Sequence, residues 1–102
     1  MVTMQEIRKE LQDVRYYYKR KEAFDKMLKN GNSNTVLGTV AKYAEVLKTA
    51  PPKLLDTYYG LYVENKTQEA FAYDLGFSPE YIRRWNAELL TFLQKELSKN
   101  GR

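Results

Sequence analysis

Between residues 3 and 28 the apolar side chains recur at intervals of three and four, which is the spacing of one face of an α-helix. The stripe is formed by Ile7, Leu11, Val14 and Tyr18, and it continues toward Leu28 after a small change of phase. Between Ile7 and Val14 the intervening positions are all polar or charged, apart from Leu11 of the stripe itself. The pattern therefore predicts one long helix over residues 3–28.

The segment 30–34, NGNSN, is the clearest break in the chain, because glycine adopts a left-handed conformation easily and Asn and Ser suit turns and helix caps. A second helix is expected over residues 35–49, and it is long enough to pack against the first as an antiparallel hairpin. The apolar face of this second helix consists of Val36, Val40, Tyr43, Ala44 and Leu47.

A pair of prolines separates the second helix from a third. Pro51 disfavours a helical conformation at Ala50, so the second helix is expected to end there. Pro52 suits the first turn of a helix, where no backbone N–H is needed. The third helix is therefore expected over residues 52–63, followed by a short exposed link. Its apolar and aromatic residues are Leu54, Leu55, Tyr58, Tyr59, Leu61 and Tyr62.

Two more helices complete the chain. Thr67 offers an N-cap hydroxyl to a fourth helix over residues 68–75, and Gly76 ends that helix. Ser78 is expected to cap a fifth helix, with Pro79 in its first turn, that continues to about residue 99. The buried side of the fifth helix is expected to consist of Ile82, Trp85, Leu89, Phe92, Leu93 and Leu97.

These five helices predict an all-α fold. Residues 1–50 are expected to form an N-terminal helical hairpin and residues 51–102 a three-helix module, and the two parts either pack as one domain or stay separate. A chain of 102 residues with 43% apolar and 14% aromatic residues has enough material for a core and no compositional sign of disorder.

The composition excludes most catalytic and metal-binding chemistry. The chain has no histidine and no cysteine, so it lacks the commonest general base, imidazole and thiolate metal ligands, and disulfides. Its acidic residues alternate with lysines, without a paired-carboxylate motif or a glycine-rich phosphate loop. We therefore expect no enzymatic activity and no cofactor. With no apolar run long enough to cross a membrane and no secretory signal pattern, a cytoplasmic protein is the simplest interpretation.

The spacing around Gly76 matches a DNA-binding helix-turn-helix. Such a motif needs a short first helix, a small residue where the second helix crosses it, and a tight turn. Gly76 fits the turn, and Ala72, four residues earlier, fits the crossing position. The alternative is an ordinary helical corner in which Gly76 is only a C-cap. The helix-turn-helix is favoured because the inward positions are also filled by apolar residues, namely Phe71, Leu75, Phe77, Ile82 and Trp85.

Residues 54–97 resemble region 4 of bacterial sigma factors, and more closely the small ArpU/RinA-type phage transcriptional regulators that carry a region-4-like module. The resemblance lies in three stretches: YYGLYVEN at the end of the third helix, TQEAFAYDLGFS in the fourth helix and turn, and YIRRW in the fifth helix. It implies a cytoplasmic, DNA-binding transcriptional regulator encoded by a phage or mobile element in a bacterial host. It also implies that the helix after Gly76 reads duplex DNA.

The best candidates for DNA contacts lie at the start of the fifth helix. Arg83 and Arg84 project away from the inward Ile82, and a guanidinium group matches both guanine and phosphate oxygens. Glu80 is placed to accept from a cytosine amine, and the start of the fourth helix offers backbone N–H groups to a phosphate. Alternatively, the two arginines are only solvated helix surface. The predicted DNA-binding residues are Thr67, Gln68, Ser78, Glu80, Tyr81, Arg83 and Arg84.

The net charge of +4 is unevenly distributed along the chain. Residues 1–30 hold eight lysines and arginines against five acidic residues, whereas residues 67–97 hold three against five. A secondary basic patch is expected within RYYYKRK, at Arg15, Lys19, Arg20 and Lys21. The simplest interpretation of this patch is a solvated helix flank. The alternatives are stacking of its tyrosines on nucleic-acid bases and contact with the DNA backbone beside the fifth helix.

The acidic balance of residues 67–97 favours an alternative to DNA binding. In this second hypothesis the chain is a protein-interaction module that docks on RNA polymerase or another regulator. A third hypothesis is an accessory protein of phage packaging or recombination. The first two differ in salt dependence, because phosphate contacts weaken steeply with ionic strength and apolar protein interfaces do not. The apolar stripe at Phe92, Leu93 and Leu97 either packs on the first helix or forms a homodimer contact.

Overall fold

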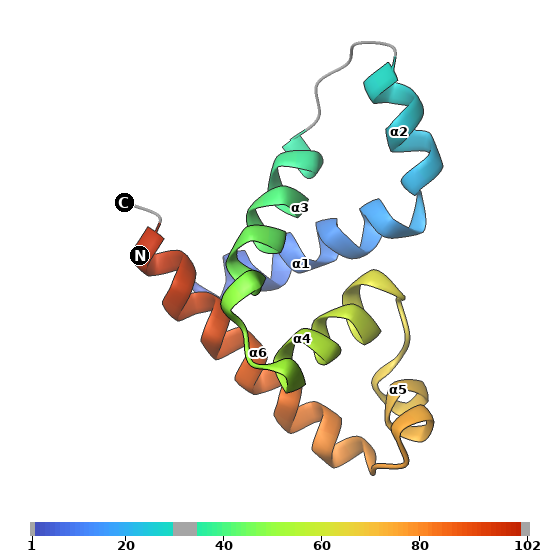
Figure 1. Cartoon of the computed structure of the whole chain (residues 1–102), viewed down its shortest axis with the longest axis vertical. Helices are drawn as coiled ribbons and strands as arrows, with labels where there is room; N and C mark the ends of the chain where they lie inside the picture. The colour runs from blue at the N-terminus through green and yellow to red at the C-terminus, as the bar shows by residue number, and fades with distance from the viewer. Residues whose placement is uncertain (1, 30–34, 101–102) are drawn as a thin grey trace.

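The computed structural model describes residues 2–29 and 35–100, and every regular element in these residues is helical. This confirms the predicted all-α fold. Within these residues there are six α-helices, a 3-10 turn (η1) and a π-helical segment (η2), and Figure 1 shows their arrangement. The bounds are Met4–Lys19 (α1), Lys21–Lys29 (α2), Thr35–Val46 (α3), Leu47–Thr49 (η1), Pro52–Tyr58 (α4), Tyr59–Val63 (η2), Gln68–Leu75 (α5) and Pro79–Asn100 (α6).

The predicted single helix over residues 3–28 is wrong, because the chain leaves the helical conformation at Arg20. Arg20 has φ −121° and ψ 31°, and its N–H donates to the carbonyl oxygens of Tyr16 and Tyr17, which ends α1. α2 then runs in another direction (Figure 1). The change of phase in the apolar stripe coincides with this break. The turn predicted over residues 30–34 lies outside the described residues.

The buried faces of α1 and α3 differ from the prediction by one position each. Tyr17 is buried where the stripe predicted Tyr18, which is only half-buried and meets the edge of the Tyr17 ring at 4.9 Å between centroids. In α3 the predicted Ala44 is exposed, whereas Val46 is buried. Tyr17 and Tyr18 are adjacent near one edge of the apolar face of α1, so helical spacing alone does not choose between them. In α3, Ala44 and Val46 lie at opposite edges of the apolar face, and the packing of the helix decides which edge is covered.

The two prolines act as predicted. Ala50 is extended, with φ −73° and ψ 145°, and Pro52 occupies the first turn of α4. The predicted third helix has the expected span, but its last part, η2, is wound as a π-helix. The N–H of Glu64 reaches back five residues to the carbonyl oxygen of Tyr59, at 2.8 Å.

Gly60, within η2, allows a close approach to α5. A Cβ atom added at Gly60 would lie 2.6 Å from Cδ1 of Phe71 and closer still to Cε1, so any larger residue requires the ring to move. The link after η2 is not simply exposed, as the sequence predicted. Asn65 has a left-handed φ of 60°, and its side chain exchanges two hydrogen bonds with Arg15 of α1, each 3.2 Å long.

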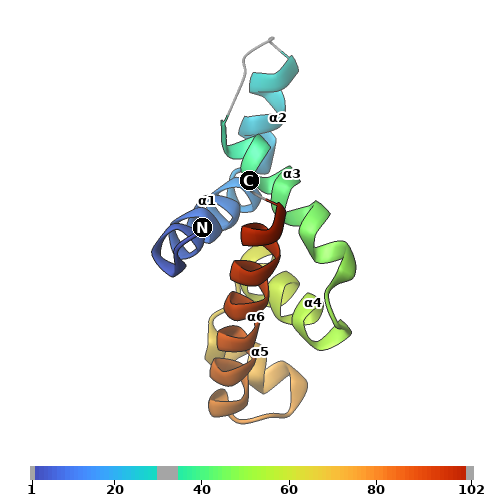
Figure 2. The same cartoon turned by 90° about the vertical axis from the view of Figure 1, so that its left-hand side faces the viewer.

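Buried side chains form two clusters. The large cluster joins α1, α3, η1, α4 and the C-terminal part of α6, and comprises Ile7, Leu11, Val14, Tyr17, Val40, Tyr43, Val46, Leu47, Leu54, Tyr58, Leu89, Leu90, Leu93 and Leu97. The small cluster joins η2, α5 and the start of α6, and comprises Leu61, Phe71, Ala72 and Ile82. α6 therefore belongs to both clusters, and Figure 2 shows it extending from α5 toward α1.

The start of the chain lies against the C-terminal half of α6. The backbone N–H of Val2 donates to Oγ of Ser98 at 3.3 Å, and the Gln94 amide donates to the Val2 carbonyl oxygen at 3.2 Å. Leu93 and Leu97 are buried in the large cluster beside residues of α1. Of the two uses expected for the apolar stripe of α6, packing on the first helix is therefore the one observed.

Candidate nucleic-acid interface

The turn between α5 and α6 has the backbone geometry predicted for it. Oγ1 of Thr67 accepts the N–H of Ala70 at 3.0 Å and so caps the start of α5. Gly76 ends α5 in the left-handed conformation, with φ 75° and ψ 25°. The next N–H, of Phe77, donates to the carbonyl oxygen of Ala72 at 2.9 Å, which closes the helix end.

Packing between α5 and α6 follows the prediction at its centre. Ala72 is buried at the crossing, so the small side chain does let the two helices meet there. Phe71 and Ile82 are buried around it, and Trp85 is half-buried at the edge of the small cluster. Four of the predicted helix-turn-helix positions therefore have the expected side-chain placement.

Two other positions were predicted wrongly. Leu75 is 42% exposed and Phe77 is 43% exposed, although both were expected to point inward. Ala72 is the last residue of α5 in the small cluster, and Leu75, in the final position of the helix, lies outside it. Phe77 lies on the outer surface, with its ring centroid 5.6 Å from that of Tyr81 and 5.4 Å from that of Trp85.

The predicted DNA-reading residues of α6 stand on its exposed surface and contact one another. Nη1 of Arg83 lies 2.7 Å from Oε1 of Glu80, which forms an ion pair one turn apart. The guanidinium carbon of Arg84 lies 5.3 Å from the centroid of the Tyr81 ring, within the range of a cation–π contact. Each arginine is thus held in place by a neighbour while its outer face stays in solvent.

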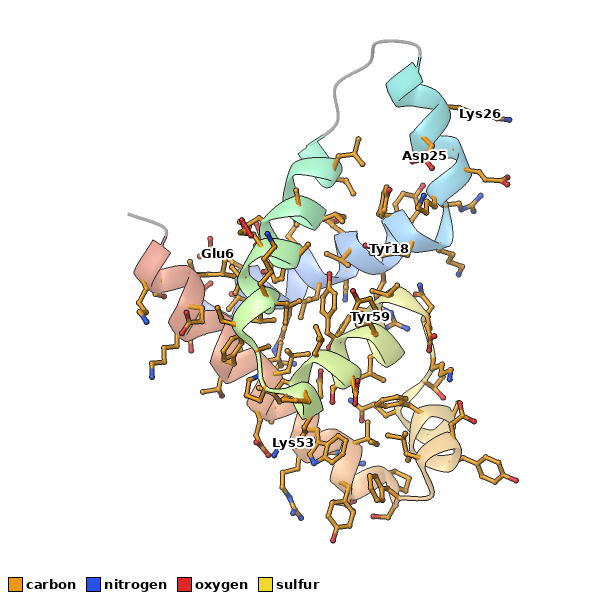
Figure 3. The ribbon with its side chains drawn as sticks, in the orientation of Figure 1. Glu6, Tyr18, Asp25, Lys26, Lys53 and Tyr59 are labelled. Carbon is orange, nitrogen blue, oxygen red and sulfur yellow. The ribbon has the colours of Figure 1, made fainter. Side chains whose placement is uncertain are left out.

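A lysine that the sequence analysis did not single out joins this surface from α4. Nζ of Lys53 lies 2.9 Å from a carboxylate oxygen of Glu88 and 5.9 Å from the centroid of the Trp85 ring. Figure 3 labels Lys53 at the start of α4, next to α6. No local signal around Lys53 could have shown this contact, because it depends on how α4 packs on α6.

The structure separates the seven predicted DNA-binding residues into two groups. Thr67 and Gln68 lie at the start of α5, and the other five lie at the start of α6. The eight residues of α5 put about 12 Å between its first turn and the turn glycine. The first group therefore stands one helix length from the turn. The second group consists of Ser78, Glu80, Tyr81, Arg83 and Arg84.

The secondary basic patch predicted at Arg15, Lys19, Arg20 and Lys21 does not form one continuous helix face, because α1 ends at Lys19 and α2 begins at Lys21. Lys21 is ion-paired with Asp25 at 3.0 Å. Arg15 instead lies beside the link after η2, where its Nε donates to the Asn65 side chain. The patch is therefore divided between the α1–α2 junction and the link.

Residues 2–29 and 35–100 contain no group of three or more histidine, cysteine or acidic side chains placed to hold a metal ion. None of the helices in these residues is both long and apolar enough to cross a membrane. Comparisons with protein-family models, with curated proteins and with solved structures found no match for the chain.

Proposed function

We propose that the chain binds duplex DNA through α5, the Gly76 turn and the first half of α6, as a transcriptional regulator of phage or mobile-element origin. The observation that carries the proposal is the packing at the turn. A left-handed glycine, a buried Ala72 and a buried Ile82 fix α6 across α5. This leaves Arg83 and Arg84 exposed on the outer side of α6. The family resemblance of residues 54–97 points the same way.

The two arginines have different parts in this proposal. Arg84 has no carboxylate partner among the described residues, and its guanidinium carbon lies 5.3 Å from the Tyr81 ring centroid, so its charge is available to phosphate or guanine. Arg83 is partly neutralised by Glu80 and must exchange this partner for DNA. Glu80 thereby lowers the affinity of Arg83 for DNA. It favours a DNA site with a cytosine whose amine can donate to the Glu80 carboxylate.

The test is fluorescence anisotropy with labelled duplex DNA from the neighbourhood of the gene, at low and at physiological salt. The wild type is compared with Arg83→Ala/Arg84→Ala. We expect binding that weakens with salt, and at least about a tenfold loss of affinity in the double variant. Lys95→Ala/Lys99→Ala removes the same charge from the exposed far end of the same helix and should bind nearly as the wild type does. Equal losses in both variants would contradict a role in reading DNA.

A second candidate function is protein docking on RNA polymerase or another regulator, and one observation favours it. Four large apolar or aromatic side chains are exposed around the turn: Tyr73 (86%), Leu75 (42%), Phe77 (43%) and Tyr81 (48%). Such a surface is typical of protein contacts. In this case Tyr73→Ala/Phe77→Ala would abolish capture of purified RNA polymerase, and the binding would change little between low and high salt. No capture by the wild type would rule this partner out.

A further inference from the structure

A hollow of about 180 Å³ lies between α1, η2 and α6, away from the turn. We call it the α1–α6 hollow. Its apolar lining is Leu11 and Leu90, both buried in the large cluster. Its polar lining comes from three elements and consists of Arg8, Gln12, Arg15, Tyr62 and Asn86. None of these residues is among the predicted DNA contacts at the start of α5 and of α6.

The hollow has an unbalanced positive charge. Arg8 and Arg15 both line it, and among the described residues no acidic side chain does. Neither arginine forms an ion pair in the described part of the chain. Arg83, by contrast, is held by Glu80. Of the five described arginines only Arg83 forms an ion pair, and two of the other four, Arg8 and Arg15, line this hollow.

The neighbouring polar groups leave hydrogen-bond donors available in the hollow, which suits an anion. The Tyr62 hydroxyl donates to Oδ1 of Asn86 at 2.6 Å, which leaves the Asn86 amide nitrogen as a donor. Nε of Arg15 donates to Asn65, which fixes the direction of that side chain and leaves its terminal nitrogens available. Burial raises the pKa of the Tyr62 hydroxyl, and this is opposed by its hydrogen bond with Asn86 and by the charges of Arg15 and Arg8, which line the same hollow.

We propose that the α1–α6 hollow binds a phosphate group. Two guanidinium groups with amide donors between them match the oxygens of a phosphate, and arginine forms paired, charge-assisted hydrogen bonds with it. The volume suits a phosphate with a small attached group and is below the roughly 300–1,000 Å³ of a pocket for a whole organic ligand. The phosphate belongs either to the DNA backbone or to a free phosphate or monoester.

The position of the hollow on α6 makes the DNA backbone the favoured source. Residues 83, 86 and 90 are spaced by three and four, so Arg83, Asn86 and Leu90 lie along one side of α6. Asn86 and Leu90 line the hollow, and Arg83 stands one turn before them. A strand contacted by Arg83 would therefore continue toward Arg8 and Arg15. In this form the inference rests on the proposed DNA binding, whereas binding of free phosphate does not.

The test compares the wild-type chain with Arg8→Gln, Arg8→Lys and Lys9→Gln. Arg8 and Lys9 are adjacent, exposed residues of α1, but only Arg8 lines the hollow, so Lys9→Gln is a control with the same loss of charge. Inorganic phosphate is titrated at constant ionic strength while the side-chain amide NMR signals of Gln12 and Asn86 are followed. The dependence of duplex-DNA affinity on salt is measured for the same four proteins.

Saturable shifts of both amides by phosphate, weakened about tenfold or more by Arg8→Gln and less by Arg8→Lys, would support a free phosphate ligand. A DNA salt dependence whose slope falls by about 0.9 in Arg8→Gln but not in Lys9→Gln would support a backbone phosphate. If Arg8→Gln and Lys9→Gln behave alike in both measurements, the inference is overturned. If phosphate binds in an Arg8-dependent way but the wild type binds no DNA, the proposed function fails while the hollow remains a phosphate site.

Discussion

The two hydrophobic clusters differ in how much of the molecule holds each one together. The large cluster draws on α1, α3, η1, α4 and α6 and surrounds fully buried side chains such as Tyr43 and Leu93 on several sides. The small cluster has four buried residues in a single layer between η2, α5 and α6. A core of this size cannot stabilise an independent unit. The helix-turn-helix therefore depends on α6, whose second half is fixed in the large cluster.

The difference also separates where the molecule is stable from where it is expected to act. Around the small cluster, exposed aromatic rings and arginines occupy the surface of the turn. Side chains left in solvent there contribute little to stability, so they are free to serve recognition. Local opening is expected to be easier in α5 than in α1, since α5 has few buried contacts.

Matched core deletions provide the largest test of this comparison. Ile82→Ala empties a fully buried position in the small cluster and Leu93→Ala one in the large cluster. We expect each to lower the free energy of unfolding by about 2–5 kcal/mol in urea denaturation. In hydrogen exchange, Ile82→Ala should speed the α5 amides far more than those of α1, whereas Leu93→Ala should speed both. Uniform exchange in Ile82→Ala would show that the two clusters open as one.

Gly60→Ala tests the contact that joins η2 to the small cluster. The added methyl group would overlap the Phe71 ring, so we expect a loss of about 1–3 kcal/mol in the free energy of unfolding. Phe71→Leu alone should also destabilise, but in the double variant the two losses should be less than additive because the smaller side chain leaves room for the methyl group. Additive losses would mean that the methyl group added at Gly60 does not clash with the Phe71 ring.

Alkaline pH should act mainly through the large cluster. Burial raises the pKa of Tyr43, with its hydrogen bond to Glu10 as a second cause, and burial raises that of Tyr58. In the unfolded chain both hydroxyls ionise near pH 10, while in the folded chain they remain protonated. Stability is therefore complete below about pH 10 and falls above it, by about 1.4 kcal/mol per pH unit for each tyrosine.

Chemical denaturation between pH 9 and pH 11.5 measures this slope. Tyr58→Phe keeps the buried ring and removes the hydroxyl. The fall in the free energy of unfolding per pH unit should therefore be smaller by the contribution of one tyrosine. Tyr73→Phe, at the exposed surface of the turn, is the control. A slope unchanged by Tyr58→Phe would mean that this hydroxyl does not titrate differently in the folded chain.

The smallest expected effect on stability belongs to Glu80→Gln. The Glu80–Arg83 pair is exposed, and such pairs contribute under about 1 kcal/mol, so the thermal midpoint should hardly move. DNA affinity should nevertheless rise severalfold at low salt, because Arg83 no longer has to leave a carboxylate. Glu69→Gln removes an acidic charge from the first turn of α5, away from the turn at Gly76. It is the matched control for the effect of net charge alone. A rise of equal size in both variants would leave the Glu80–Arg83 pair without a specific part in binding.

The sequence predicts helix ends better than it predicts which side chains are buried. The bounds of α5, the extended Ala50 and the left-handed Gly76 all follow from local chemistry, namely a capping threonine, a proline and a glycine. Leu75 and Phe77 have the right residue types for the inside of the motif, yet both stay more than 40% exposed, and Phe77 contacts only the outer edge of α6 at Tyr81 and Trp85. Burial depends on which surfaces meet in three dimensions, and the spacing of apolar residues along one helix does not specify that.

The same limit applies to the candidate sites. RYYYKRK stands out as a basic stretch, and the helix break at Arg20 divides it. Arg8 has no distinguishing neighbours in the sequence, where it stands between Ile7 and Lys9, and it lines the α1–α6 hollow only because Tyr62 and Asn86 are brought to it by other elements. The exposed arginines of α6 could be predicted, because they follow from the position of Ile82. The ion pair of Arg83 with Glu80 also follows from their spacing.

The π-helical segment gives the chain room for one residue more than an α-helix would hold over the same length. A π-turn has one residue more than an α-turn between its hydrogen-bonded ends, and it takes up that residue without redirecting the chain on either side. Deleting one residue from residues 61–63 would therefore let an ordinary α-helix form there, while the chain that follows keeps nearly its orientation relative to α4. The approach of Gly60 to Phe71 and the contact of Asn65 with Arg15 are expected to survive this deletion. A codon can thus be lost at this turn without moving α6.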